Sequence, residues 1–399
     1  MRALRHRDFR LLWIGAFLSF TGSWVQTVAQ GWLAYQITGQ DEAKLAFVTF
    51  CGMAPVSILG PFAGTLTDTY NKRWLLILAQ ALFAAGALFL ALAVARGFIQ
   101  YWHLVAVALL FGVVGAFEMP TRHSLVSRVV PPEDLANAIP INGMTFNLAR
   151  LIGPAIGGWV YHRFGAETCY GANGISYLAL IFAVMAMRTD MRATESEPQP
   201  IKDLLLEGML YTFRDRRLRN LFVLESATST FGLIYVPLMP AIVAKLLTSQ
   251  VEVVGYCFTW VGVGAVAGLL FLARMADRPI KARVVKLAMM GVGLTLFALA
   301  FVRERPIAYG LLAMMGVCSI MQFNLTNTLF QLLSPERLRG RVIAMHIWAL
   351  SGMAPIGIIL SGWVARQVSI PFALEMGGLG VVVFALWGWL NRGGLAGVG

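Results

Sequence analysis

Long apolar runs separated by short polar breaks cover the chain from one end to the other. A helix needs about 20 residues to cross the ~30 Å hydrocarbon core of a membrane, and twelve runs approach or exceed this length. A transmembrane β-barrel would instead show shorter segments in which apolar and polar residues alternate. The pattern predicts an all-α polytopic membrane protein with helices over 11–35, 45–66, 74–95, 104–130, 137–161, 168–187, 219–242, 253–273, 287–302, 307–332, 342–365 and 371–391.

Composition agrees with a membrane protein, because 58% of the residues are hydrophobic and only 13% are charged. A net charge of +12 is also found in proteins that bind nucleic acids. However, the basic residues flank apolar runs, where membrane topology and anionic lipid account for them, so no nucleic-acid partner is predicted. The four cysteines stand singly, without metal-ligand spacing, and we predict neither a metal nor another cofactor.

Most of the 32 Lys and Arg residues fall on one side of the membrane if the N-terminus is cytoplasmic. Positive residues favour the cytoplasmic side, so both termini are expected there. The first apolar run is too long for the core of a cleaved signal peptide and should remain as the first helix.

The longest polar stretch follows the sixth run and resembles a linker between two six-helix halves. We therefore predict an N-terminal bundle over 1–190, a cytoplasmic linker with an amphipathic segment over 191–218, and a C-terminal bundle over 219–399. Internal repeats favour this division, since Arg10 and Asp68 correspond to Arg219 and Asp277 at the same offset. Gly-Trp-Val also occurs twice, at 158–160 and 362–364.

The segment after the second run, Gly64-Thr65-Leu66-Thr67-Asp68-Thr69-Tyr70-Asn71-Lys72-Arg73, resembles the loop signature of the major facilitator superfamily. Thr69 and Asn71 depart from the family pattern. The resemblance implies a cytoplasmic gate, in which an acid near a helix end pairs with basic or helix-dipole partners. Alternatively, the basic pair only sets topology. The predicted gate residues of the two repeats are Gly64, Asp68, Lys72, Arg73, Asp277 and Arg278.

Gly153, Pro154, Gly157 and Gly158 in the fifth run resemble a motif of the exporter branches of that superfamily. Small residues allow close helix approach and Pro permits a bend, so ordinary packing is the alternative interpretation. The first 33 residues further resemble a bacterial branch that includes enterobactin-type siderophore and macrolide exporters. The resemblance covers essentially the whole chain.

Few ionisable residues lie inside the predicted spans, where they usually face a cavity or a partner. Glu118 and Arg150 should lie at similar depth on antiparallel helices, and Arg122 competes with Arg150 as an i, i+4 partner of Glu118. Glu118 or Glu225 would exchange a proton during transport, or else form a permanent ion pair. The single histidines, His123 and His346, are expected to be structural.

Polar residues recur at helical spacing on the first, seventh and tenth runs, which family architecture places around a central cavity. Trp24 and Tyr235 could stack on an aromatic solute, or simply pack. The candidate cavity residues are Ser23, Trp24, Gln26, Gln30, Ser229, Tyr235, Asn324, Asn327 and Gln331.

The resemblance implies a monomeric exporter of amphipathic organic molecules such as drugs, macrolides or siderophores, in the bacterial inner membrane. Alternating access driven by proton antiport is expected, with protons, membrane lipid and a small-molecule substrate as partners. A transporter of lipid-like solutes such as lysophospholipids is the alternative. A multi-pass membrane enzyme is disfavoured, because no nucleotide-binding loop or hydrolase motif occurs.

We predict that a fluorescent protein fused after Gly399 fluoresces, whereas a phosphatase that is active only outside the cytoplasm stays inactive there. Positive-inside topology is the reason. The same phosphatase fused after Arg96, in an expected outer loop, serves as the control and should be active. An active phosphatase at Gly399 would contradict the predicted orientation.

Overall fold

The computed structural model describes residues 2–68, 70–191, 201–274 and 281–391. The first half contains η1 (Ala3–Arg5), α1 (Arg7–Ile37), α2 (Glu42–Asp68), α3 (Lys72–Ala95), α4 (Tyr101–Val129), η2 (Pro132–Asp134) and α5 (Leu135–Ala186). The second contains α6 (Ile201–Arg214), α7 (Arg216–Ala227), η3 (Thr228–Gly232), α8 (Tyr235–Ile242), η4 (Val243–Leu247), α9 (Val251–Arg274), α10 (Lys281–Leu299), α11 (Arg305–Leu333), η5 (Glu336–Leu338), α12 (Arg339–Ile347), η6 (Trp348–Gly352), α13 (Ala354–Gln367) and α14 (Ile370–Leu390).

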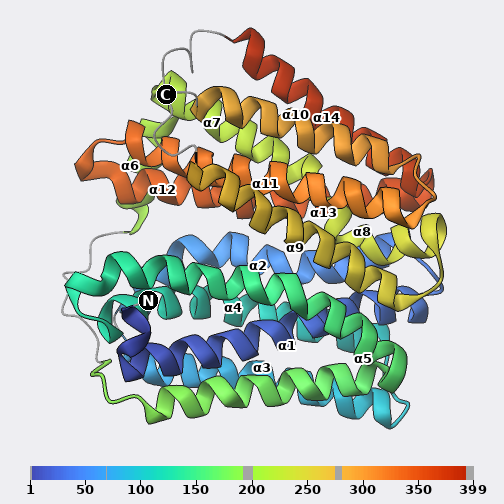
Figure 1. The fold of residues 1–399 in the computed structure, drawn as a ribbon, viewed down its shortest axis with the longest axis horizontal. Coiled ribbons are helices and arrows are strands. Elements are labelled where there is room, and N and C mark those ends of the chain that lie inside the picture. Colours follow the sequence, from blue (N-terminus) through green and yellow to red (C-terminus); the bar gives the residue numbers. More distant parts are fainter. Residues whose placement is uncertain (1, 69, 192–200, 275–280, 392–399) are drawn as a thin grey trace. The chain divides into compact units, whose positions relative to one another are not determined.

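The described residues form helices throughout, which confirms the all-α prediction, and they include 11 helical segments long and apolar enough to span a membrane. One of these segments, α5, contains two of the predicted spans, which form two helical arms separated by a sharp non-helical bend. Gly165 makes the bend at φ 83°, a conformation that glycine adopts without steric cost. Figure 1 shows the two arms of α5 running in opposite directions from that bend.

The helices separate into two compact units. Unit 1 comprises 1–39, 54–198 and 250–259, and unit 2 comprises 40–53, 199–249 and 260–399. Two short segments therefore pack away from their own half of the sequence: the start of α2 belongs to unit 2, and the start of α9 belongs to unit 1.

The two exchanged segments occupy equivalent places in the internal repeat. In unit 1, a Cβ on Gly158 would lie 2.9 Å from Glu252 Cα in the first turn of α9. In unit 2, a Cβ on Gly362 would lie 2.3 Å from Ala46 Cβ near the start of α2. The repeated Gly-Trp-Val motif thus provides the same close helix contact in both units, which requires glycine on one side.

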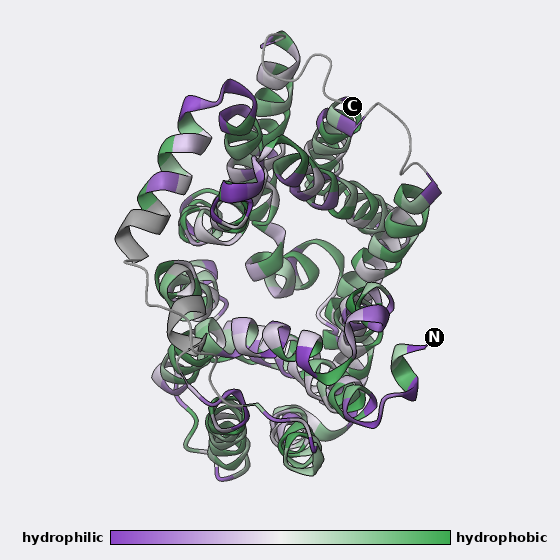
Figure 2. Cartoon of the chain, turned by 90° about the vertical axis from the view of Figure 1, so that its left-hand side faces the viewer, coloured by the Kyte–Doolittle hydropathy of each residue, from purple (hydrophilic) through white to green (hydrophobic). Residues whose placement is uncertain are grey.

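Each unit has its own apolar core. In unit 1 the core includes Phe9, Leu12, Leu76 and Leu125, all with no exposed area. In unit 2 a larger cluster joins α7, α10, α11, α12 and α14. Figure 2 shows hydrophobic residues along most helices and hydrophilic residues gathered toward helix ends, as expected for helices surrounded by lipid.

The predicted amphipathic linker segment contains α6, which packs within unit 2. Glu207 of α6 forms an ion pair of 2.7 Å with Arg337 and a second with Arg341. A Cβ on Gly208 would lie 2.9 Å from the Arg341 carbonyl oxygen, so α6 approaches the start of α12 closely.

The glycine motif of α5 is packed on two sides inside unit 1. A Cβ on Gly153 would lie 2.6 Å from Trp24 Cβ, and one on Gly157 would lie 2.8 Å from Val25 Cα. On the other side, a Cβ on Gly255 of α9 would lie 2.3 Å from the carbonyl oxygen of Pro154. Every one of these contacts is tighter than a side chain tolerates, so close approach explains the small residues.

We predict that Gly157→Ala lowers the free energy of unfolding by about 1–3 kcal/mol, because the added methyl group meets the backbone of α1. The matched control is Gly171→Ala on the second arm of α5, where an added Cβ meets nothing within 4 Å. Thermal unfolding of the two purified variants in detergent measures the difference. Equal stability of the two would contradict this account of the motif.

Candidate functional site

An ion pair lies inside unit 1 between Glu118 and Arg122, one turn apart on α4. Glu118 Oε1 is 2.8 Å from Arg122 Nε, and both residues are buried. Gln80 of α3 donates to the same carboxylate oxygen at 3.4 Å, and Ser19 of α1 donates to Gln80 at 3.4 Å. Three helices thus supply the groups that compensate a buried charge, which is costly to leave unpaired.

Two arginines of unit 1 lie over aromatic rings of α1. The Arg122 guanidinium is 4.0 Å from the centre of the Phe20 ring, and that of Arg150 is 5.9 Å from Trp24. The Phe146 ring packs against both, with its centre 5.5 Å from that of Phe20 and 6.4 Å from that of Trp24. Glu118 is therefore paired with Arg122, the i, i+4 alternative, while Arg150 lies against Trp24.

A second polar network joins α1 to the second arm of α5. Asn173 donates at 2.7 Å to Gln26 and at 3.1 Å to the Tyr177 hydroxyl, which also lies 3.1 Å from Ser23 Oγ. Gln26 in turn donates to Gln30 at 3.3 Å. Gln26 is buried by these contacts, whereas Ser23, Trp24 and Gln30 keep partial exposure. Part of the predicted polar stripe therefore holds helices together.

In unit 2, Glu225 on α7 has no exposed area. The Thr326 hydroxyl of α11 faces its carboxyl group, but neither carboxyl oxygen makes a hydrogen bond of good geometry among the described residues. His346 of α12 is the nearby ionisable group, with Nδ1 3.9 Å from Glu225 Oε1, and it is also buried. This distance is too long for a hydrogen bond.

The remaining candidates of unit 2 divide between buried and accessible positions. Ser229 is buried and donates to the Leu350 carbonyl oxygen, and Tyr235 is buried as well. On α11, Asn324, Asn327 and Gln331 keep exposed area, and Gln331 donates to Asn327 at 2.9 Å. Of the candidate cavity residues in unit 2, these three on α11 are the accessible ones among the described residues.

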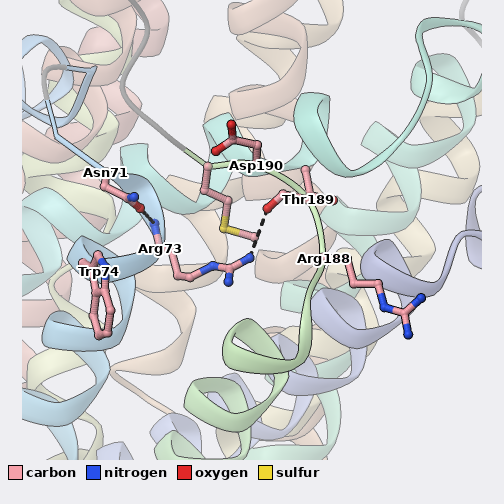
Figure 3. A pocket seen from close by; sticks show the side chains of 7 residues that line it. Asn71, Arg73, Trp74, Arg188, Thr189 and Asp190 are labelled. Carbon is pink, nitrogen blue, oxygen red and sulfur yellow. Dashed lines mark hydrogen bonds between the residues drawn. The ribbon is translucent and has the colours of Figure 1, made fainter.

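The basic end of the predicted gate joins the start of α3 to the chain beyond α5. Arg73, at the start of α3, donates to the carbonyl oxygens of Met187 at 2.8 Å and Thr189 at 3.0 Å, beyond the end of α5. Figure 3 shows Arg73 pointing toward Thr189 across a pocket of about 350 Å³. Asp8 of α1 accepts from the Arg188 and Thr189 backbone amides, each at 2.8 Å.

Lys72 is buried beside Arg73 and joins the same region through its backbone amide, which donates to Met191 at 3.0 Å. Gly64 and Asp68 lie in the last turns of α2, but the surroundings of both residues are outside the description. Asp277 and Arg278 lie outside the described residues. The structure thus describes the basic end of the predicted gate, and its acids stay a prediction.

Sequence reasoning missed several residues of these clusters. Gln80 is a lone polar residue in the apolar run of α3, and this isolation could have indicated a buried hydrogen-bonding role. Asn173 and Tyr177 are four residues apart on one helix face, which was a second signal. No sequence pattern connected His346 with Glu225, because 121 residues separate them and only the fold brings them together.

Two compact helical units, repeated motifs in both, and buried paired charges are the features expected of a major facilitator transporter. The family model described as transmembrane secretion effector matches residues 1–392, and the chain belongs to this family. It is therefore a multi-pass membrane transporter of small molecules and not an enzyme.

Curated relatives along nearly the whole chain are transporters. The staphyloferrin A transporter of Staphylococcus aureus is 23% identical and aligned over 94% of each chain. The multidrug efflux pump Tap of Mycobacterium tuberculosis is 26% identical over 88% of this chain and 85% of its own. Macrolide efflux protein A of Streptococcus pyogenes is 22% identical over 95% and 94%. These relatives confirm the resemblance to siderophore and macrolide transporters.

Solved structures support the fold independently of close sequence similarity. The nucleoside transporter NupG superposes with a TM-score of 0.74 at 15% identity, covering 96% of this chain and 98% of its own. At this identity the likeness concerns the fold alone, and it confirms the major facilitator architecture.

We predict that Glu118→Gln lowers the free energy of unfolding by about 3 kcal/mol, because Arg122 loses its anionic partner while buried. The double variant Glu118→Gln with Arg122→Gln should recover most of this loss, since no charge is left unpaired. Thermal unfolding in detergent measures both, with the exposed Arg96→Gln as the control. A double variant less stable than Glu118→Gln would contradict the importance of the pair.

Proposed function

We propose that the protein exports amphipathic organic molecules by alternating access and proton antiport. Its relatives are named for a siderophore, for macrolides and for multiple drugs, and these names suggest the substrate range. The sequence halves 1–190 and 219–399 would move against each other, with both termini in the cytoplasm of a bacterial cell. The exchanged segments at the starts of α2 and α9 would then separate from their present unit in each cycle.

The aromatic and basic residues of unit 1 suit an amphipathic solute. Trp24 and Phe146 offer rings with exposed area, and Arg150 adds a positive charge beside them. Rings bind apolar groups by stacking, while the guanidinium can bind a polar or anionic group at the other end of the solute. Arg122 is paired with Glu118 and lies over the Phe20 ring, which also contacts Phe146.

The proposal of proton antiport rests on the burial of Glu225 without a close cationic partner. An ionised carboxylate buried at membrane depth needs a charged partner or hydrogen bonds, and Glu225 makes no hydrogen bond of good geometry among the described residues. A carboxyl group that carries a proton is neutral and avoids most of this penalty. Glu118 is less suited to the same task, because Arg122 already neutralises it.

We predict that an imposed proton gradient drives efflux of a fluorescent amphipathic dye in proteoliposomes, and that Glu225→Gln reduces it by about 100-fold. A glutamine side chain cannot release a proton, so the coupled step is lost. Glu118→Gln should keep gradient dependence at a lower rate. Glu304→Gln, at the exposed start of α11, is the control.

Wild-type protein that moves no dye under a gradient would contradict drug export by proton antiport. The same vesicles with a fluorescent lysophospholipid then test a lipid-like substrate. Gradient-driven efflux that survives in Glu225→Gln would remove Glu225 from the coupling step.

A further inference from the structure

The interior of unit 2 holds two further polar groups near Glu225 in the fold: Thr326, which faces Glu225, and Gln322, which contacts Thr228 three residues after it. Gln322 and Thr326, one turn apart on α11, have almost no exposed area. The Gln322 amide nitrogen donates to Thr228 at 2.7 Å, but its oxygen has no partner among the described residues. The Thr326 hydroxyl faces Glu225 without a hydrogen bond of good geometry. Buried polar groups are nearly always hydrogen-bonded, so a cluster of four unsatisfied groups requires an explanation.

The cluster stands where two transmembrane helices are interrupted. The π-helix η3 begins at Thr228, three residues after Glu225, and the π-helix η6 begins at Trp348, two residues after His346. Ser229 of η3 donates to Leu350 of η6, so the two interruptions pack on each other. π-helical turns occur frequently at functional sites, because their wider turn permits local changes of register.

No other charged group compensates the pair. Among the described residues, no cationic side chain other than His346 lies within 4.0 Å of Glu225. Glu207 and Arg341 on the neighbouring α6 and α12 pair with each other. The other ionisable residues with described side chains on α6, α7, α11, α12 and α14, which pack around Glu225, are Tyr211, Arg214, Arg216, Arg217, Arg219, Arg305, Tyr309, Cys318, Arg339 and Glu375. The side chains of Lys202 and Asp203 on α6 lie outside the description.

We infer that Glu225 and His346 form a single proton-binding site, in which His346 is the second proton carrier of the transport cycle. The inference rests on the proposed proton antiport and identifies the group that exchanges the proton with Glu225. With one proton the site is neutral overall, either as a carboxyl group beside imidazole or as a carboxylate beside imidazolium. Both forms avoid an uncompensated charge in the apolar interior.

Proton movement within the site conserves atoms and charge. The O–H bond of the Glu225 carboxyl group breaks as an N–H bond forms at His346 Nδ1, and the resulting ions attract each other. Because 3.9 Å exceeds hydrogen-bond length, the two side chains must approach before this transfer. A change of register in η3 or η6 supplies that approach. The Thr326 hydroxyl faces Glu225 and can donate to the carboxylate once it forms.

Infrared difference spectroscopy of the purified full chain tests the inference without requiring transport. The carboxyl band that disappears in Glu225→Gln is assigned to Glu225, and its loss is followed as pH rises. We expect His346→Gln to move the midpoint of this loss upward by about one pH unit or more, because the imidazolium no longer stabilises the carboxylate. His123→Gln on α4 is the matched control and should leave the midpoint in place.

An unchanged midpoint in His346→Gln would overturn the shared site. If Glu225→Gln does not fold, Glu225→Asp replaces it, and the displaced carboxyl band then makes the assignment. A shifted midpoint in His346→Gln would support the shared site even if dye efflux by the wild-type protein did not depend on the proton gradient. That independence would contradict proton antiport alone. The two hypotheses therefore fail separately.

Discussion

Charge neutralisation in an apolar interior is the constraint on which the two candidate sites depend. Hydrocarbon and packed side chains solvate ions poorly, so each ionisable group at membrane depth needs an opposite charge, hydrogen bonds or a proton. Unit 1 meets this need with Arg122, which lies 2.8 Å from Glu118. Unit 2 lacks such a partner for Glu225 among the described residues, and this difference separates a structural charge pair from a candidate proton site.

The packing of the exchanged segments depends on close contact between helices. Glycines at 153, 157 and 158 bring α5 against α1 and the start of α9, and Gly362 brings α13 against the start of α2. The repeated Gly-Trp-Val motif, through Gly158 and Gly362, thus contacts both exchanged segments. Contacts built from small residues bury little side-chain volume and need few side-chain rearrangements to separate, which suits surfaces that alternate between two conformations.

The sequence predicts the helices well, because membrane thickness dictates the length of each apolar run. The pairing of Glu118 with Arg122 was one of two alternatives, since i, i+4 spacing fixes that geometry on one helix. Two features were beyond sequence reasoning. Local propensity does not mark the π-helices η3 and η6. The approach of His346 to Glu225 depends on how α12 packs against α7.

The most direct test of proton antiport reverses the driving force. Proteoliposomes that contain a pH-sensitive dye are loaded with substrate, diluted into substrate-free buffer, and held at zero membrane potential. The account predicts that substrate leaving the vesicles carries protons inward, so that the lumen acidifies with wild-type protein and not with Glu225→Gln. Substrate efflux with a constant lumenal pH would contradict it.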